Sequence, residues 1–245
     1  MTLSIKAIKR ICLISMFSAM PPGPIFAGAY SNFPLARLSD LKPFTRDLGG
    51  LMGSGMNQTA RILGFSGFDL GFRGTTQLAP EEKNGILKKN HPFSLGWVQA
   101  EIGMPFRIDG FIRAGSYDSI ALAGGGLKYG LTKPLDEPYR TQAMIVAMGN
   151  MATQKYFYAT QFSASLFFSI NLPHLAPYFS AGFDNTKLTV QSGTVDTSLI
   201  RKKIYAMEQR YTFGLRAKFK LGYISGGVTR THSRTLVSAG AGLRF

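Results

Sequence analysis

Apolar and small or basic side chains alternate along the last eleven residues, 235–245. One set of positions holds Thr235, Val237, Ala239, Ala241, Leu243 and Phe245, and the other holds Arg234, Leu236, Ser238, Gly240, Gly242 and Arg244. Successive side chains of a β-strand point to opposite faces, so the first set shares one face. The pattern predicts a strand with one apolar face, which fits either the edge of a sandwich or a strand in contact with lipid.

A longer alternating stretch covers residues 211–223. Its apolar positions are Tyr211, Phe213, Leu215, Ala217, Phe219, Leu221 and Tyr223, and between them lie Thr212, Gly214, Arg216, Lys218, Lys220 and Gly222. A tilted strand of this length spans about 30 Å, enough to cross an apolar band of about 25 Å. We expect the basic residues to face a barrel lumen, and Tyr211 and Tyr223 to lie in two aromatic girdles.

The whole pattern from residue 65 onward predicts ten antiparallel strands, although eight or twelve are also compatible with it. The expected strands are 66–78, 93–104, 106–115, 119–131, 139–149, 156–171, 176–190, 199–208, 211–223 and 235–245. Expected periplasmic turns are 105, 133–138, 172–175 and 209–210, and expected outer loops are 79–92, 116–119, 150–155, 191–198 and 224–234. Short turns therefore mostly alternate with longer loops, as in transmembrane barrels.

Residues 1–29 have the three parts of a secretory signal peptide. A basic region with Lys6, Lys9 and Arg10 is followed by the apolar residues 11–20 and by Ala27-Gly28-Ala29 as a cleavage site. An uncleaved membrane helix is the alternative, but ten apolar residues are far fewer than the roughly 20 needed to span a bilayer. The single cysteine, Cys12, lies in this leader, which excludes disulfides and thiolate chemistry from the mature chain.

Residues 30–64 do not alternate. Leu35, Leu38 and Leu41 have helical spacing, while Pro43 and a cluster of glycines after it limit the length of a helix. We expect a short helix here, in a periplasmic segment or in a plug of the lumen, followed by the barrel domain at 65–245.

The alternating strands, the leader and a final strand that closes on Phe245 together resemble the outer-membrane β-barrel proteins of Gram-negative bacteria. The resemblance implies an all-β antiparallel transmembrane barrel in the bacterial outer membrane. It also implies that Phe245 is an assembly signal, read by the barrel assembly machinery, and that outer-membrane lipids and lipopolysaccharide are partners.

The mean hydropathy is only +0.04 and no apolar run is long enough for a membrane helix, which excludes a helical membrane protein. The net charge of +15 falls to +12 without the three basic residues of the leader. The residues expected on a basic lumen face are Arg107, Arg113, Lys128, Arg216, Lys218, Lys220 and Arg244, with Asp69, Asp109 and Asp184 among them. These cations either pair with the acids inside a closed barrel or line an anion-favouring path.

Catalytic and metal chemistry find little support in the sequence. His91 and His174 lack a second ligand at metal spacing, so we expect neither a metal nor a cofactor. His232-Ser233 invites comparison with lipid A deacylase barrels, yet no acidic residue follows Glu208 to orient the imidazole, and a solvated loop histidine is expected instead.

The function predicted is a non-enzymatic outer-membrane barrel. It would act as a passive channel, anion-favouring if open, or as a structural or surface-interaction protein. The alternative is an outer-membrane hydrolase that acts on lipid or peptide at the barrel rim. A secreted barrel meets little nucleic acid, so none is expected as a partner, and the oligomeric state stays open.

Overall fold

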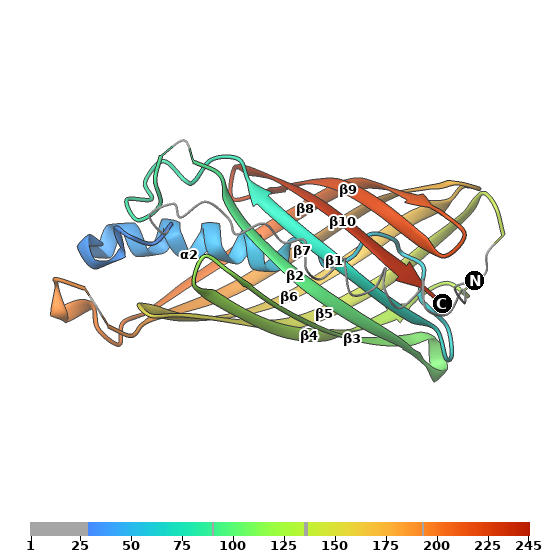
Figure 1. Cartoon of the computed structure of the whole chain (residues 1–245), viewed down its shortest axis with the longest axis horizontal. Coiled ribbons are helices and arrows are strands. Elements are labelled where there is room, and N and C mark those ends of the chain that lie inside the picture. The colour runs from blue at the N-terminus through green and yellow to red at the C-terminus, as the bar shows by residue number, and fades with distance from the viewer. Residues whose placement is uncertain (1–28, 90, 135–136, 193) are drawn as a thin grey trace, which may run out of the picture.

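The chain forms a closed barrel of ten antiparallel strands in the computed structural model, which describes residues 29–89, 91–134, 137–192 and 194–245 (Figure 1). The strands are β1 Phe68–Gln77, β2 Phe93–Met104, β3 Ile108–Tyr117, β4 Ile120–Gly130, β5 Arg140–Gln154, β6 Phe157–Asn171, β7 Leu175–Val190, β8 Lys203–Lys218, β9 Gly222–Thr231 and β10 Arg234–Arg244. Each strand pairs with its sequence neighbours, and β1 pairs with β10 to close the barrel. The predicted fold class is confirmed, while the leader, apart from Ala29, lies outside the described residues.

The outer surface of the barrel is apolar all the way around. Exposed apolar side chains on the ten strands include Leu70, Phe72, Val98, Ile112, Leu127, Ile145, Phe162, Phe168, Phe179, Phe213, Leu215, Val228, Val237 and Leu243. Polar side chains alternate with them and point inward, for example Ser163, Asp184 and Arg210. A closed barrel satisfies every backbone hydrogen bond between strands, so this apolar exterior suits a lipid environment.

The two ends of the barrel differ in the length of their connections. Residues 78–92 and 191–202 form the two longest loops and lie at the end opposite the C-terminus (Figure 1). Outer-membrane barrels have their longer loops outside the cell, so that end is extracellular and Phe245 lies at the periplasmic end. Three extracellular connections are two-residue turns, Asp118-Ser119, Lys155-Tyr156 and His232-Ser233. In the first and the last, both residues have positive φ, the geometry that suits tight hairpins.

The strand count is as predicted, but the division of the chain differs in two places. The predicted outer loop 150–155 is mostly the end of β5, and the larger difference follows residue 198. The predicted strands 199–208 and 211–223 are largely one strand, β8, and the predicted outer loop 224–234 is mostly the strand β9. The turn expected at 209–210 lies in the middle of β8, and the real turn is at 219–221. Alternation continues through this turn, so the sequence pattern does not mark it.

Residues 29–67 form the plug segment, and its central part, 43–62, is mostly buried inside the barrel. A short 3₁₀ helix, η1 (Phe33–Leu35), precedes the helix α2 (Leu38–Gly53), which packs on β6, β7 and β8 in the extracellular half (Figure 1). The segment after α2 passes down the lumen and meets β1 at the periplasmic end. Among the described residues, no helix is long and apolar enough to cross a membrane.

Glycines let α2 approach the barrel wall closely. A Cβ atom on Gly53 would overlap the guanidinium of Arg210 and the carboxylate of Asp184, and one on Gly49 would overlap Thr186. The glycines were expected to limit the length of the helix. They instead form the last turns of α2, where the helix packs most closely on the barrel wall.

The extracellular half of the lumen is a hydrophobic core shared by this segment and the strands. Tyr30, Phe33 and Phe44 interlock with Phe93 and Phe157, and the ring centroids of Phe44 and Phe157 are 5.1 Å apart. Edge-to-face aromatic packing of this kind contributes beyond simple area burial. The core fills the mouth of the barrel where an open channel would hold water.

Candidate functional site

Glu101 on β2 is the centre of a buried charge cluster in the middle of the lumen. Its carboxylate lies 2.7 Å from Arg73 Nη2 and 2.5 Å from Lys128 Nζ, and it accepts a hydrogen bond from Gln99. All four side chains are buried. Buried charges are tolerated when they are paired and hydrogen-bonded, and here one acid serves two cations.

A second buried cluster joins Arg210 on β8 to Asp184 on β7. Arg210 Nη1 lies 2.6 Å and 2.8 Å from the two Asp184 oxygens, and Nη2 donates to Ser163 and Ser165. Asp184 also accepts from Gln161. Sequence reasoning placed Arg210 in a turn, although its apolar neighbours Tyr211 and Phe213 point outward and alternation alone would have put Arg210 inside.

Backbone carbonyls at and after the end of α2 accept hydrogen bonds from lumen cations. Arg113 donates to the carbonyl of Met52 and, through Nε at 2.7 Å, to Asn150. Arg73 donates to the carbonyl of Met56 at 2.6 Å. The C-terminal end of a helix carries partial negative charge, so a cation is favoured there. The plug and the barrel wall are therefore joined by charge-assisted hydrogen bonds as well as by the hydrophobic core.

Tyr223 lies inside the barrel, which corrects its assignment to an outer girdle. Its hydroxyl donates to Asp69 at 2.8 Å, and the guanidinium of Arg216 lies 3.5 Å from the centre of its ring. Tyr223 is the register partner of Lys218 across the turn at 219–221. Paired residues of antiparallel strands point to the same face. Odd-numbered residues therefore point outward on β8 and inward on β9. Tyr211 does face outward, and half of its surface is exposed.

The basic residues predicted for the lumen fall into three groups. Arg113, Lys128 and Arg216 are buried inside the barrel. Lys218 and Arg244 line the periplasmic mouth, and Lys220 lies in the exposed turn beside them, not on a strand. Arg107 is also exposed, in the turn η2 (Pro105–Arg107), and its guanidinium lies 5.6 Å from the ring of the outward-facing Tyr129.

The assignment of Arg107 to the lumen is therefore wrong, and Lys220 lies in a turn at the periplasmic mouth instead of on the lumen face of a strand. A residue in a turn is not bound by the alternation of the strand beside it. The acids named with these cations, Asp69, Asp109 and Asp184, are all buried in the interior. Arg73, Glu101, Arg210 and Asp47 are further buried charged residues of the interior, and sequence reasoning missed them.

His232 is buried, not solvated. Its Nε2 atom lies 2.8 Å from Asp47 Oδ1, so an acid on α2 orients the imidazole and the expectation that none would do so is wrong. Asp47, Glu81 and His232 offer ligand atoms within 4.8 Å of one another. Asp47 Oδ1 also accepts from Gln77, and Oδ2 accepts from Asn84 and from the backbone of Glu81, so the carboxylate is fully used as a hydrogen-bond hub.

The same geometry bears on nucleophilic catalysis at Ser233. The second imidazole nitrogen, Nδ1, is buried without a hydrogen-bond partner among the described residues, and a Cβ on Gly50 of α2 would lie 3.6 Å from it. A histidine that activates a serine must direct one nitrogen to that serine and to the substrate. Here one nitrogen faces Asp47 and the other is shielded by the helix.

Phe245 closes the sheet at the periplasmic end. Its backbone N–H donates to Phe68 and its carbonyl accepts from Phe68, which extends the pairing of β10 with β1 by one residue. The ring points outward and is two-thirds exposed. Val237, Ala239, Ala241 and Leu243 share its face of β10, as the sequence pattern predicted.

The closed ten-stranded barrel, its apolar exterior and its polar and plugged interior define a bacterial outer-membrane β-barrel protein. No family model matches the chain, and none of the curated proteins does.

Solved structures of similar shape include the N-terminal β-barrel domain of Pseudomonas aeruginosa OprF, at 13% identity over 74% of this chain and 99% of that one, with a TM-score of 0.41. The KdgM porin in complex with oligogalacturonate has 8% identity over 72% and 99% of the two chains and a TM-score of 0.38. LpxR from Salmonella typhimurium has 7% identity over 73% and 99% and a TM-score of 0.29. The assignment to outer-membrane β-barrel proteins therefore rests on the closed barrel and its apolar outer surface and not on these similarities.

Proposed function

We propose that this protein is a non-enzymatic outer-membrane barrel that its own N-terminal segment keeps closed. In this state it serves as a structural or surface-interaction protein and not as a passive channel. The observation that carries the proposal is the hydrophobic core inside the extracellular half of the barrel, where α2 and the lumen-facing side chains exclude water.

The polar half of the lumen supports the same conclusion. Its cations form ion pairs with Glu101, Asp184 and Asp69 or donate hydrogen bonds to plug carbonyls. A passing ion would therefore find these side chains already bound to one another and no continuous path of water. A non-enzymatic role also agrees with the shielded imidazole of His232, which leaves Ser233 without an activating base.

Displacement of the plug would convert the barrel into an anion-favouring pore. Arg113 would lose the carbonyl of Met52 and would keep the neutral amide oxygen of Asn150 as an acceptor, so its charge would face water, while Arg73 would keep its ion pair with Glu101. Rings of basic side chains favour anions in pores. The anion preference expected from the composition therefore belongs to the unplugged barrel.

Single-channel recording on the refolded protein tests the proposal. We expect no steady conductance from the parent protein. The positive arm is the double variant Phe44→Asp, Leu48→Asp, which places charges in the core and should expel the helix while the strands remain paired. We expect anion-selective conductance from this variant when gel migration shows that it is folded. Steady conductance of the unmodified protein at low voltage would overturn the proposal.

A further inference from the structure

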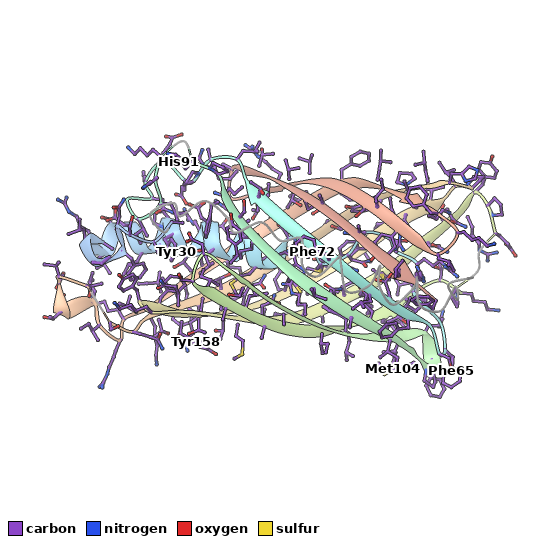
Figure 2. All side chains as sticks on the ribbon, viewed as in Figure 1. Tyr30, Phe65, Phe72, His91, Met104 and Tyr158 are labelled. Atoms are coloured by element: carbon purple, nitrogen blue, oxygen red, sulfur yellow. The ribbon has the colours of Figure 1, made fainter. Side chains whose placement is uncertain are left out.

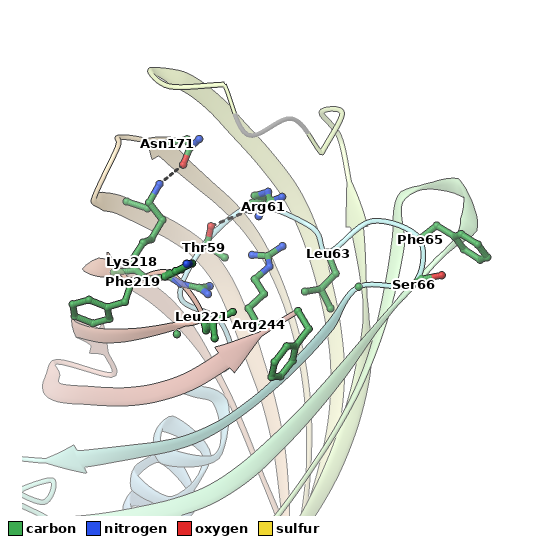
Figure 3. A pocket seen from close by; sticks show the side chains of 16 residues that line it. Thr59, Arg61, Leu63, Phe65, Ser66, Asn171, Lys218, Phe219, Leu221 and Arg244 are labelled. Carbon is green, nitrogen blue, oxygen red and sulfur yellow. Dashed lines mark hydrogen bonds between the residues drawn. The ribbon is translucent and has the colours of Figure 1, made fainter. Parts of the chain in front are cut away.

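A cavity of about 530 Å³ opens at the periplasmic end of the barrel (Figure 3). The ends of β6 to β10 and the plug segment that leads into β1 form its walls. It lies at the end opposite α2 and takes no part in the closure of the extracellular mouth. Its volume is within the range of about 300 to 1,000 Å³ that is usual for small-molecule sites.

The cavity is strongly basic. Its cationic lining residues are Arg61, Arg216, Lys218, Lys220 and Arg244, and no Asp or Glu that the structure describes lines it. The carboxylate of Asp69 lies 3.7 Å from the guanidinium of Arg216, on the side toward the barrel interior. The same carboxylate accepts a hydrogen bond from the hydroxyl of Tyr223. The part of the lining that the structure describes thus carries five basic side chains and no acidic one.

Several of these cations are held in place by the fold. The Arg216 side chain is 7% exposed, lies flat on the ring of Tyr223, and its buried Nε atom has no hydrogen-bond partner among the described residues. Arg244 Nη2 donates to the carbonyl of Ile62 at 2.8 Å, and Lys218 Nζ donates to Asn171 at 2.5 Å. Side chains fixed before binding lose little conformational entropy when an anion arrives.

The rim of the cavity is apolar. Phe65, Phe219, Leu221 and Phe245 line it and are each more than half exposed. Figure 3 shows Phe219 and Leu221 at one side of the opening, with Arg61, Lys218 and Arg244 around the space behind them. A basic interior behind an apolar rim fits an anionic group that is attached to an apolar body.

We propose that this cavity binds a phosphate group. The arginine and lysine side chains of the lining supply the charge-assisted hydrogen bonds that phosphate oxygens accept. The group is presented either by a phospholipid of the periplasmic leaflet, which the apolar rim favours, or by a soluble phosphate in the periplasm.

Two binding measurements on the refolded, full-length barrel separate these sources. Native mass spectrometry compares retention of phosphatidylglycerol with retention of phosphatidylcholine, and calorimetry in zwitterionic detergent uses inorganic pyrophosphate. We expect selective retention of phosphatidylglycerol. Arg244→Gln should weaken it about tenfold, the worth of one charge-assisted hydrogen bond. Lys220→Glu changes an exposed turn residue, so it should weaken binding without disturbing the fold. Lys83→Gln, in the extracellular loop, is the matched control and should have no effect.

The outcomes divide clearly. Lipid retention without pyrophosphate binding, lost in both cavity variants, assigns the site to a lipid. Pyrophosphate binding that is lost in the same variants assigns it to a soluble phosphate. Absence of both, or equal loss in Lys83→Gln, overturns the proposal.

Discussion

The Nε2 atom of His232 lies 2.8 Å from Oδ1 of Asp47, which joins the turn between β9 and β10 to the helix inside the barrel. Asp47 also accepts hydrogen bonds from Gln77, from Asn84 and from the backbone of Glu81. One carboxylate therefore holds the plug, a strand end, a hairpin turn and the long loop 78–92 in one arrangement (Figure 2 shows His91 in this loop).

Asp47→Ala should loosen this arrangement. Removing the carboxylate leaves buried donors without an acceptor, which costs about 1 to 3 kcal/mol for each group left unsatisfied. We expect faster tryptic cleavage after Lys83 in the loop, measured on the refolded protein. The control is Glu82→Ala, which removes an adjacent but exposed charge. Equal cleavage rates in the two variants would show that Asp47 does not anchor the loop.

Arg210 and Asp184 should behave as a coupled pair in urea unfolding. Arg210→Met leaves the Asp184 charge buried and unpaired, with an expected loss of about 3 to 5 kcal/mol. The double variant Arg210→Met, Asp184→Leu should recover most of that loss, because both charges are then absent. Arg230→Met removes an exposed arginine from neighbouring β9 and should change stability by no more than about 0.5 kcal/mol. Additive effects of the two single changes would contradict the pairing.

The folded barrel should migrate faster on a gel when unheated than when boiled. A closed barrel has no free strand edge at which unfolding begins, so it stays compact in detergent until it is heated. Fully paired strands β1 and β10 provide this closure. The measurement is the mobility of one refolded sample under both conditions, and equal mobility in a sample with native circular dichroism would argue against closure.

Phe245→Ala should reduce assembly in the outer membrane far more than it reduces stability. The ring is 67% exposed, so its loss costs at most about 2 kcal/mol of buried area. Phe219→Ala is a close control, because its ring is 62% exposed at the same end of the barrel. The experiment compares outer-membrane levels in cells with refolding yields in detergent. Normal levels of Phe245→Ala in the membrane would remove the assembly role of the terminal aromatic residue.

The sequence alone determined the type of the fold and most of its strands. A period of two is a local property, so 93–104 and 156–171 were predicted with their observed ends or within one residue of them. The outward face of β10 followed from the same alternation. The lack of alternation in 30–64 likewise separated the plug segment from the barrel, because a strand between lipid and lumen requires two different faces.

Only the tertiary structure decided where each face changes and which charges meet. The turn at 219–221 preserves the alternating pattern, so the inward position of Tyr223 depends on its pairing with Lys218. Asp47 and His232 are 185 residues apart and meet because barrel closure and the inserted helix bring them together. The lumen cations are neutralised by acids on other strands and by carbonyls of the plug. Such contacts depend on register and on the path of the plug, and neither leaves a local signal in the order of residues.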